Sequence, residues 1–226
     1  YFLFFAWIAQ GWRTTRRLLA VGLPISMQMV LEVSAFALTL IMMGWIGTVP
    51  LAAHQVVLSL SNIVYMVVVG ISAATTIMVS HRYGAGDYRG MRRAALASWH
   101  LGIVANLLTM ACFVAFRRFL PELFTSDRAV IGVAAQLFLM AALYQIPDGL
   151  QTIALGVLRG MQDVRITMYY AFVSYIVINL PVGYFCAFIL GWGAPGLWVG
   201  FIVGLCIAAF LLIRRYRRLY RRLTLD

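Results

Sequence analysis

The chain has 226 residues, of which 63% are hydrophobic and only 11% are charged, and its formal net charge is +11. Soluble domains are about 45–50% apolar, so this composition excludes an ordinary soluble domain and favours a protein embedded in a membrane. The chain contains 18 arginines and no lysine, and the distribution of these arginines decides whether lipid or nucleic acid is the expected partner.

Six apolar stretches follow one another along the chain. They are Leu18–Ile46, Leu51–Tyr83, Ala94–Phe116, Val130–Leu158, Ile166–Leu190 and Leu197–Ile213. A bilayer-spanning helix needs about 20 apolar residues, and all but the last stretch clearly exceed that length. The stretches lack the apolar–polar alternation of outer-membrane strands. The sequence therefore predicts an all-α polytopic membrane protein with six transmembrane helices.

The predicted organisation has three parts. Residues 1–16 are expected to hold the end of a preceding helix and a cytoplasmic linker, residues 17–213 the six-helix lobe, and residues 214–226 a basic cytoplasmic tail. The aromatic run Tyr1–Ala9 is too short to span a bilayer and lacks the features of a signal peptide. It is typical of the end of an earlier helix, so we expect the chain to be a fragment.

The arginines concentrate on one side of the predicted membrane. Fifteen lie on that side, at positions 13, 16, 17, 82, 89, 92, 93, 159, 165, 214, 215, 217, 218, 221 and 222, and only Arg117, Arg118 and Arg128 lie on the other. The positive-inside rule predicts that both ends of this segment are cytoplasmic. Membrane phospholipid explains these arginines, so lipid is an expected partner and nucleic acid is not.

Two carboxylates lie within the apolar stretches, Glu32 in the first and Asp148 in the fourth. A charged side chain near the middle of a membrane costs roughly 3 kcal/mol on insertion scales, and it persists where it faces a wet cavity and has a function. No arginine lies in the interior of a predicted span, so we expect the two acids to lack a basic partner. The pattern predicts a site for a proton, for a metal cation such as Na⁺ bound by Glu32 and Asp148, or for a cationic molecule.

Polar residues accompany these acids on several predicted helices. On the fourth, Tyr144, Asp148 and Gln151 follow i, i+4, i+7 spacing and share a face. The other candidates are Gln28 beside Glu32 on the first helix, Ser61, Asn62 and Tyr65 on the second, and Asn179 on the fifth. We expect the two acids and the two tyrosines to form a cation-binding and coupling site. The amides and the serine are expected to line its cavity, with packing the alternative for Asn179.

Small residues predict where helices approach closely. Gly196, Gly200 and Gly204 repeat at four-residue spacing on the last helix, and Gly156 and Gly160 repeat it on the fourth. Such spacing lets helix backbones come together in membranes.

Enzymatic motifs are not supported. GAGD at Gly84–Asp87 matches an intramembrane aspartyl protease motif but lies in a basic loop. Gly70-Ile71-Ser72 matches the GxS motif of rhomboid proteases, but no histidine lies after His100 to act as the base for the serine. The three histidines have no metal-like spacing. We expect no enzyme activity and no cofactor, apart from transported Na⁺ or H⁺ as coupling ion.

Three segments resemble the multidrug and toxic compound extrusion (MATE) family, most closely its NorM branch. They are GLPISMQMVLEVSAFAL at Gly22–Leu38, LAAHQVVLSLSNIVYM at Leu51–Met66 and YQIPDGLQTIALGVLRGMQD at Tyr144–Asp163. The resemblance covers about Arg17 to Arg222 and corresponds to the C-terminal six of twelve helices.

The resemblance implies a secondary antiporter of two six-helix lobes that exports cationic drugs or dyes in exchange for sodium or protons. It places the cation site in the C-terminal lobe, with Glu32 and Asp148 as its carboxylates and Tyr65 and Tyr144 beside them. The N-terminal lobe is absent from the chain, so we expect it in the same polypeptide or in a partner half. A non-catalytic channel or subunit with a cation-attracting acidic pocket stays the alternative, and it predicts flux without counter-ion dependence.

Overall fold

The computed structural model describes residues 2–225, with side chains for residues 11–16 and 18–224. Tyr1 and the side chains of the run Tyr1–Ala9 lie outside the described residues. The interpretation of that run as the end of a preceding helix therefore stays a prediction.

The described residues form helices joined by short connections, with no strand among them. The elements are α1 (Phe2–Ile46), α2 (Thr48–Gly84), α3 (Tyr88–Phe116), α4 (Phe119–Glu122), α5 (Arg128–Gly160), α6 (Val164–Ala171), η1 (Phe172–Asn179), α7 (Leu180–Tyr184), η2 (Phe185–Ile189) and α8 (Ala194–Leu225). Six spans are long and apolar enough to cross a membrane, one of them being the continuous run from α6 to η2. The predicted fold class and the six predicted spans are confirmed.

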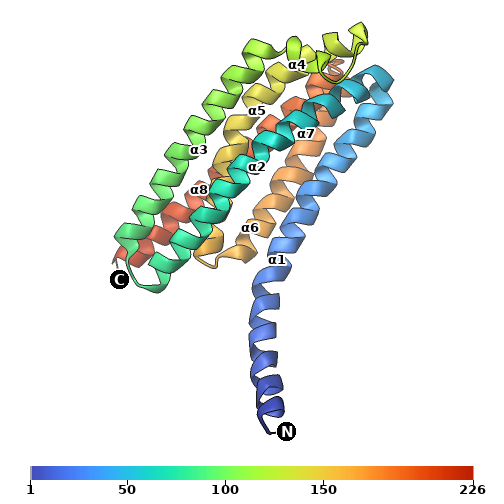
Figure 1. Ribbon diagram of the computed structural model, residues 1–226. Coiled ribbons are helices and arrows are strands. Elements are labelled where there is room, and N and C mark those ends of the chain that lie inside the picture. The colour runs from blue at the N-terminus through green and yellow to red at the C-terminus, as the bar shows by residue number, and fades with distance from the viewer. Residues whose placement is uncertain (1, 226) are drawn as a thin grey trace.

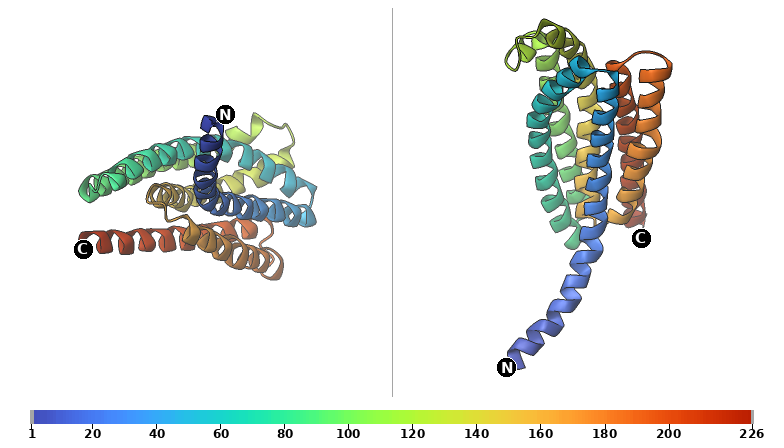
Figure 2. Two further views of the ribbon diagram at one scale, coloured as in Figure 1. Left: turned by 90° about the horizontal axis from the view of Figure 1, so that it is seen from below. Right: turned by 90° about the vertical axis from the view of Figure 1, so that its right-hand side faces the viewer.

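The spans run up and down in one bundle (Figures 1 and 2). The helix α5 packs against α2, α3 and α8, whereas α1 lies at an edge between α2 and the α6–η2 span. The first turns of α1 extend beyond the end of the bundle (Figure 2, right). Near the C-terminus, the arginines after Ile213 lie within helix α8, which continues to Leu225.

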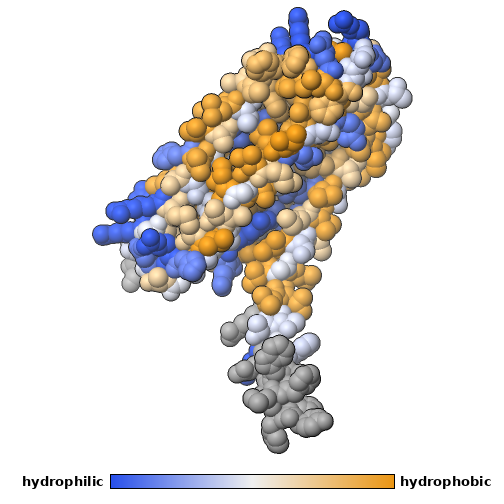
Figure 3. Space-filling model, in the orientation of Figure 1, coloured by the Kyte–Doolittle hydropathy of each residue, from blue (hydrophilic) through white to orange (hydrophobic). Residues whose placement is uncertain are grey.

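Hydrophobic side chains cover most of the face seen in Figure 3, and hydrophilic side chains gather at its two ends. Many large apolar residues are exposed along the spans, among them Leu23, Ile63 and Phe210. Such a surface is costly in water and suits contact with lipid. A row of hydrophilic residues crosses the face between α1 and α2, where a lipid-facing surface would be uniformly apolar (Figure 3).

The connection between α2 and α3 is closed by Asp87, the N-cap of α3. Its carboxylate accepts a 2.8 Å hydrogen bond from the Gly90 backbone N–H and forms a 2.8 Å ion pair with Arg82. The Gly90 N–H, followed by the Arg82 guanidinium, holds the pKa of Asp87 below its ordinary value. GAGD is thus a helix-capping turn, because its only acid is occupied by the backbone.

The predicted glycine contacts are present, and they set the distances between helices. A Cβ added at Gly156 would lie 2.6 Å from the Ser72 carbonyl oxygen on α2, and one at Gly160 would lie 2.9 Å from the Thr76 carbonyl oxygen. One added at Gly200 on α8 would lie 2.5 Å from the Asn179 carbonyl oxygen. Since Cβ atoms do not approach backbone this closely, only glycine permits these contacts.

Pro181 lies where the fifth span departs from α-helical geometry. It is at the start of α7, between the π-helical segments η1 and η2. A proline removes one backbone N–H, and a π-helical turn is one way in which a helix accommodates the interruption. By contrast, Pro147 lies within the continuous α5.

Replacement of Gly156 by alanine is expected to destabilise the bundle by about 1–3 kcal/mol, because the new methyl group meets the α2 backbone. Thermal unfolding of the purified chain in detergent measures the effect. The control is Gly132→Ala, on the same helix but with open space around the added Cβ. Equal melting temperatures for the two variants would contradict the close α2–α5 contact.

Candidate functional site

A cavity of about 230 Å³ opens between α1, α2 and α5. Its lining consists of Glu32, Val33, Phe36, Leu58, Ser61, Asn62, Tyr65 and Tyr144. Five of these eight side chains are the polar candidates from three helices, and the other three are apolar. The shared faces on α1, α2 and α5 therefore do meet around one chamber.

The Glu32 carboxylate is contacted by side chains from its own helix and from α2, and the Tyr175 hydroxyl on η1 also lies within hydrogen-bonding reach. Tyr65 Oη donates to Glu32 Oε1 at 3.4 Å, and Gln28 Nε2 donates to Glu32 Oε2 at 3.5 Å. Strong hydrogen bonds to a carboxylate are shorter, at about 2.5–2.9 Å. The carboxylate is thus held in place while its oxygens keep capacity for a further ligand.

A second, smaller cavity of about 100 Å³ lies beside Glu32 on the side of Gln28 and Tyr65. All three residues line it, and so do Thr152 and Arg159 from α5. Glu32 and Tyr65 belong to both cavities. The glutamate therefore stands at the boundary between two hollows in the bundle.

The expectation that the buried acids lack a basic neighbour is wrong. Arg159 Nη2 donates to Gln28 Oε1 at 2.9 Å, and the guanidinium acts electrostatically on Glu32. The arginine lies near the end of α5, and its side chain extends into the bundle beside α1. Gln28 therefore links a fixed positive charge on α5 to the carboxylate on α1.

Asp148 is 6% exposed and lies one helical turn after Tyr144 on α5. The Tyr144 hydroxyl lies within hydrogen-bonding reach of the Asp148 carboxyl, and Asp148 interacts electrostatically with Glu32. Tyr144 lines the larger cavity, whereas Asp148 is not among its lining residues. Asp148 is thus connected to the cavity by the hydroxyl of Tyr144, and it interacts electrostatically with Glu32 on α1.

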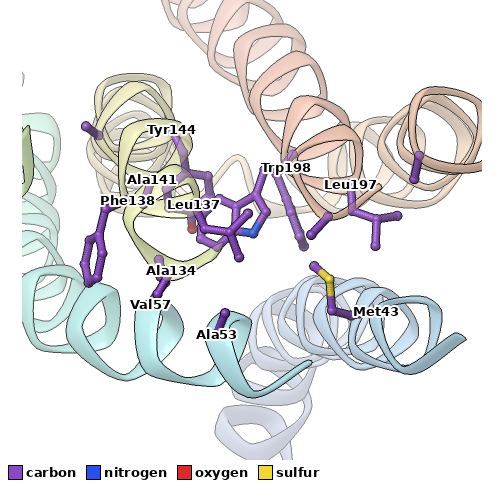
Figure 4. Close-up of a cluster of buried hydrophobic side chains, with 14 of the residues drawn as sticks. Met43, Ala53, Val57, Ala134, Leu137, Phe138, Ala141, Tyr144, Leu197 and Trp198 are labelled. Carbon is purple, nitrogen blue, oxygen red and sulfur yellow. The ribbon is translucent and has the colours of Figure 1, made fainter. Parts of the chain in front are cut away.

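Aromatic packing fixes the position of Tyr144. Its ring makes edge-to-face contacts with Trp198 at 5.7 Å and with Phe201 at 6.2 Å, both on α8. Figure 4 shows Tyr144 beside Trp198 within the buried cluster formed by α1, α2, α5 and α8. The phenol hydroxyl is therefore placed by a rigid core rather than by a loop.

The remaining candidates are distributed unevenly. Ser61 and Asn62 line the larger cavity. Gln151 does not line it, but it donates a 2.6 Å hydrogen bond to the Tyr175 hydroxyl on η1, which in turn lies within hydrogen-bonding reach of Glu32. Asn179 is 1% exposed, lines neither cavity around Glu32, and packs its backbone against Gly200. Its place in the helix contact fits the packing alternative.

Sequence reasoning missed Arg159 and Tyr175. A signal for Arg159 was present, because positions 144, 148, 152, 155 and 159 follow the i, i+4, i+8, i+11, i+15 spacing of one helix face. Tyr175 is four residues before Asn179 and shares its face, but π-helical geometry shifts the register there. Nothing in its spacing indicated the contact with Gln151.

The chemistry of the site is that of oxygen ligands. Glu32, the tyrosine hydroxyls, Ser61 and Asn62 offer the hard oxygen donors that alkali and alkaline-earth cations favour. Within residues 2–225, no group of three or more His, Cys, Asp or Glu side chains gathers as a metal cluster. The arrangement suits a proton or a weakly held cation better than a transition metal.

A six-helix membrane bundle with carboxylates beside an internal cavity defines a class of membrane transport proteins. The family model MatE matches residues 24–185, and the chain belongs to this family. Among its curated relatives, a probable multidrug resistance protein NorM from Xanthomonas campestris pv. campestris is 38% identical over 213 residues, which cover 94% of this chain and 46% of the relative. The multidrug resistance protein MdtK from Pectobacterium atrosepticum is 39% identical over 215 residues, covering 92% and 46%.

Solved structures agree in fold. The eukaryotic MATE transporter AtDTX14 matches with a TM-score of 0.84 at 24% identity, over 94% of this chain and 49% of its own. The Vibrio cholerae MATE transporter VcmN in the bent form matches with a TM-score of 0.86 at 17% identity, over 94% and 48%. The chain spans about half the length of the relatives that it matches, and the resemblance to the NorM branch is confirmed.

The Arg159–Gln28 contact can be tested by a double-mutant cycle. Arg159→Met and Gln28→Leu are each expected to lower the free energy of unfolding by about 1–3 kcal/mol, since each leaves a buried partner unsatisfied. Together they should cost less than the sum of the single effects, because both remove the same contact. Unfolding in detergent provides the measurement, with the exposed Arg165→Met as control. Strict additivity would show that the two side chains do not interact.

Proposed function

We propose that this chain is the C-terminal lobe of a cation-coupled multidrug antiporter, with Na⁺ or H⁺ as the coupling ion. The observation that carries the proposal is the Glu32 carboxylate, which lines an internal cavity and whose hydrogen bonds from Gln28 and Tyr65 are long, at 3.5 and 3.4 Å. Asp148 adds a second negative charge nearby, and Arg159 supplies one positive charge. The family and the names of its relatives support export of drugs as the activity.

The coupling rests on competition for Glu32 and Asp148. Without a bound ion, the pair carries uncompensated negative charge that attracts a cationic drug or favours one arrangement of the lobes. Entry of Na⁺ or H⁺ from the far side neutralises this charge and shifts the population toward the arrangement that releases the drug. A ligand shifts such an equilibrium only by its differential affinity for the two states, which the acids supply.

The drug cleft itself requires a second lobe. The larger cavity opens between α1, α2 and α5 and holds about 230 Å³, less than the roughly 300–1,000 Å³ of sites for drug-sized ligands. Its size suits a small ion with water. We propose that an N-terminal six-helix lobe completes the binding cleft for cationic drugs or dyes. The membrane is a bacterial inner membrane, with the arginine-rich end of this lobe in the cytoplasm.

Ion-dependent dye efflux tests the carboxylates. With the chain expressed in its natural polypeptide in cells lacking other drug pumps, Glu32→Gln and Asp148→Asn should each lower efflux by about tenfold or more, because each removes a charged contact worth roughly 1.5–3 kcal/mol. Fluorescent dye export is followed at varied external Na⁺ and pH.

The matched control is Glu122→Gln, which removes an exposed carboxylate at the opposite end of the bundle from the arginine-rich connections. Its efflux is expected to equal that of the wild type. Unchanged ion dependence in both Glu32→Gln and Asp148→Asn would reject the assigned coupling site.

A further inference from the structure

An exposed stripe along α8 changes from apolar to basic at the arginine-rich end of the bundle. Six side chains line a surface hollow of about 400 Å³ there: Phe210, Ile213, Arg214, Arg217, Arg218 and Arg221. The four arginines follow i, i+3, i+4, i+7 spacing and so share one face of the helix. The opposite face is buried, with Leu212 2% and Tyr216 5% exposed.

The arginines of this stripe differ from their neighbours in having no protein partner. Arg215, on another face of α8, forms a 2.7 Å ion pair with Asp163, and Arg92 on α3 lies 5.7 Å above the ring of Tyr220. Within residues 11–224, no hydrogen bond or ion pair involves Arg214, Arg217, Arg218 or Arg221. Four positive charges therefore lie around one hollow, without a negatively charged partner among the described residues.

The described acidic residues at this end already have basic partners. Among the described residues, the acids near the arginine-rich connections are Asp87, paired with Arg82, and Asp163, paired with Arg215. Glu32 and Asp148 lie inside the bundle, and Glu122 and Asp127 lie at its other end. Within residues 2–225, no unpaired carboxylate lies near the stripe, so an anion from another molecule could balance it.

The arginines begin at the position along α8 where the hydrocarbon core of a bilayer would end. The twenty residues from Ala194 to Ile213 span about 30 Å at 1.5 Å per residue, the thickness of the hydrocarbon core. Arg214 begins where that core ends, and Arg221 lies about 10 Å further on, across the headgroup layer. Phe210 is 62% exposed on the membrane side of the arginines, where acyl chains run.

We propose that this stripe is a binding site for an anionic glycerophospholipid, whose phosphate is held by the four arginines and whose acyl chain packs on Phe210 and Ile213. Arginine binds phosphate oxygens through a planar fork of N–H donors, which gives more specific contacts than a diffuse positive surface. This lipid site is separate from the proposed transport function, and lipid binding there does not depend on which ion drives transport.

The chain contains a second arginine group that serves as a contrast. Arg117, Arg118 and Arg128 surround a hollow of about 430 Å³ at the other end of the bundle, but Glu122 lies among them. The carboxylate offsets part of their charge and repels a phosphate. We therefore expect this group to bind anionic lipid much more weakly than the stripe on α8.

The test uses the purified chain and native mass spectrometry with phosphatidylglycerol, phosphatidylcholine or inorganic phosphate as probe. The wild type is expected to retain phosphatidylglycerol in preference to phosphatidylcholine. The variant with Arg214, Arg217, Arg218 and Arg221 all changed to glutamine should bind phosphatidylglycerol about tenfold or more weakly, since each arginine near a membrane surface contributes to the attraction. The matched variant with Arg117, Arg118 and Arg128 changed to glutamine should bind like the wild type.

A second variant distinguishes loss of lipid binding from loss of the fold. Replacement of the same four α8 residues by lysine keeps the charge but removes the planar fork, so this variant is expected to bind phosphatidylglycerol more tightly than the glutamine variant and more weakly than the wild type. Equal retention of the two lipids by the wild type, unchanged binding in the glutamine variant, or displacement of the lipid by millimolar inorganic phosphate would each overturn the proposal. The transport assay of the Glu32 and Asp148 variants is independent of these results.

Discussion

A carboxylate inside a lipid-embedded bundle must obtain its polar contacts from the protein, because the surrounding hydrocarbon offers none. Glu32 obtains them from Gln28 and Tyr65 at 3.5 and 3.4 Å, and the Tyr175 hydroxyl and the Arg159 guanidinium also act on it. The contact of Gln28 with Arg159 is shorter, at 2.9 Å. The bundle therefore holds its central acid in place without saturating it, which is the condition that a reversible cation site requires.

This arrangement depends on close packing elsewhere. Gly156 and Gly160 bring α5 against the backbone of α2, so Tyr144 and Arg159 on α5 lie near Tyr65 on α2. Larger residues at those glycines would separate the helices and widen the cavity. The edge-to-face contact of Tyr144 with Trp198 then couples α8 to the same site. A shift of one helix can in this way change the surroundings of both acids.

Much of the fold and part of the site could be predicted from the sequence. Apolar length alone defined six spans, and four-residue glycine spacing indicated close packing of α5 and α8, whose partners α2 and the α6–η2 span only the structure shows. Shared faces correctly united Glu32, Tyr65 and Tyr144 around a cavity. Arg159 shares the helix face of Tyr144 and Asp148, but its position near a helix end resembles that of any arginine at the membrane edge. The structure shows its long side chain reaching Gln28 on α1. Gln151 shares a face with Asp148 in an ideal helix, yet its partner Tyr175 is on a π-helical segment whose register the sequence does not reveal.

Infrared difference spectroscopy of the purified chain tests most directly whether the Glu32 carboxylate binds the coupling ion. We predict that addition of Na⁺, or a step in pH, changes the carboxyl and carboxylate bands of the wild type, and that Glu32→Gln removes the main part of this change. A spectrum that does not respond to either ion, or one that responds identically in Glu32→Gln, would contradict the account.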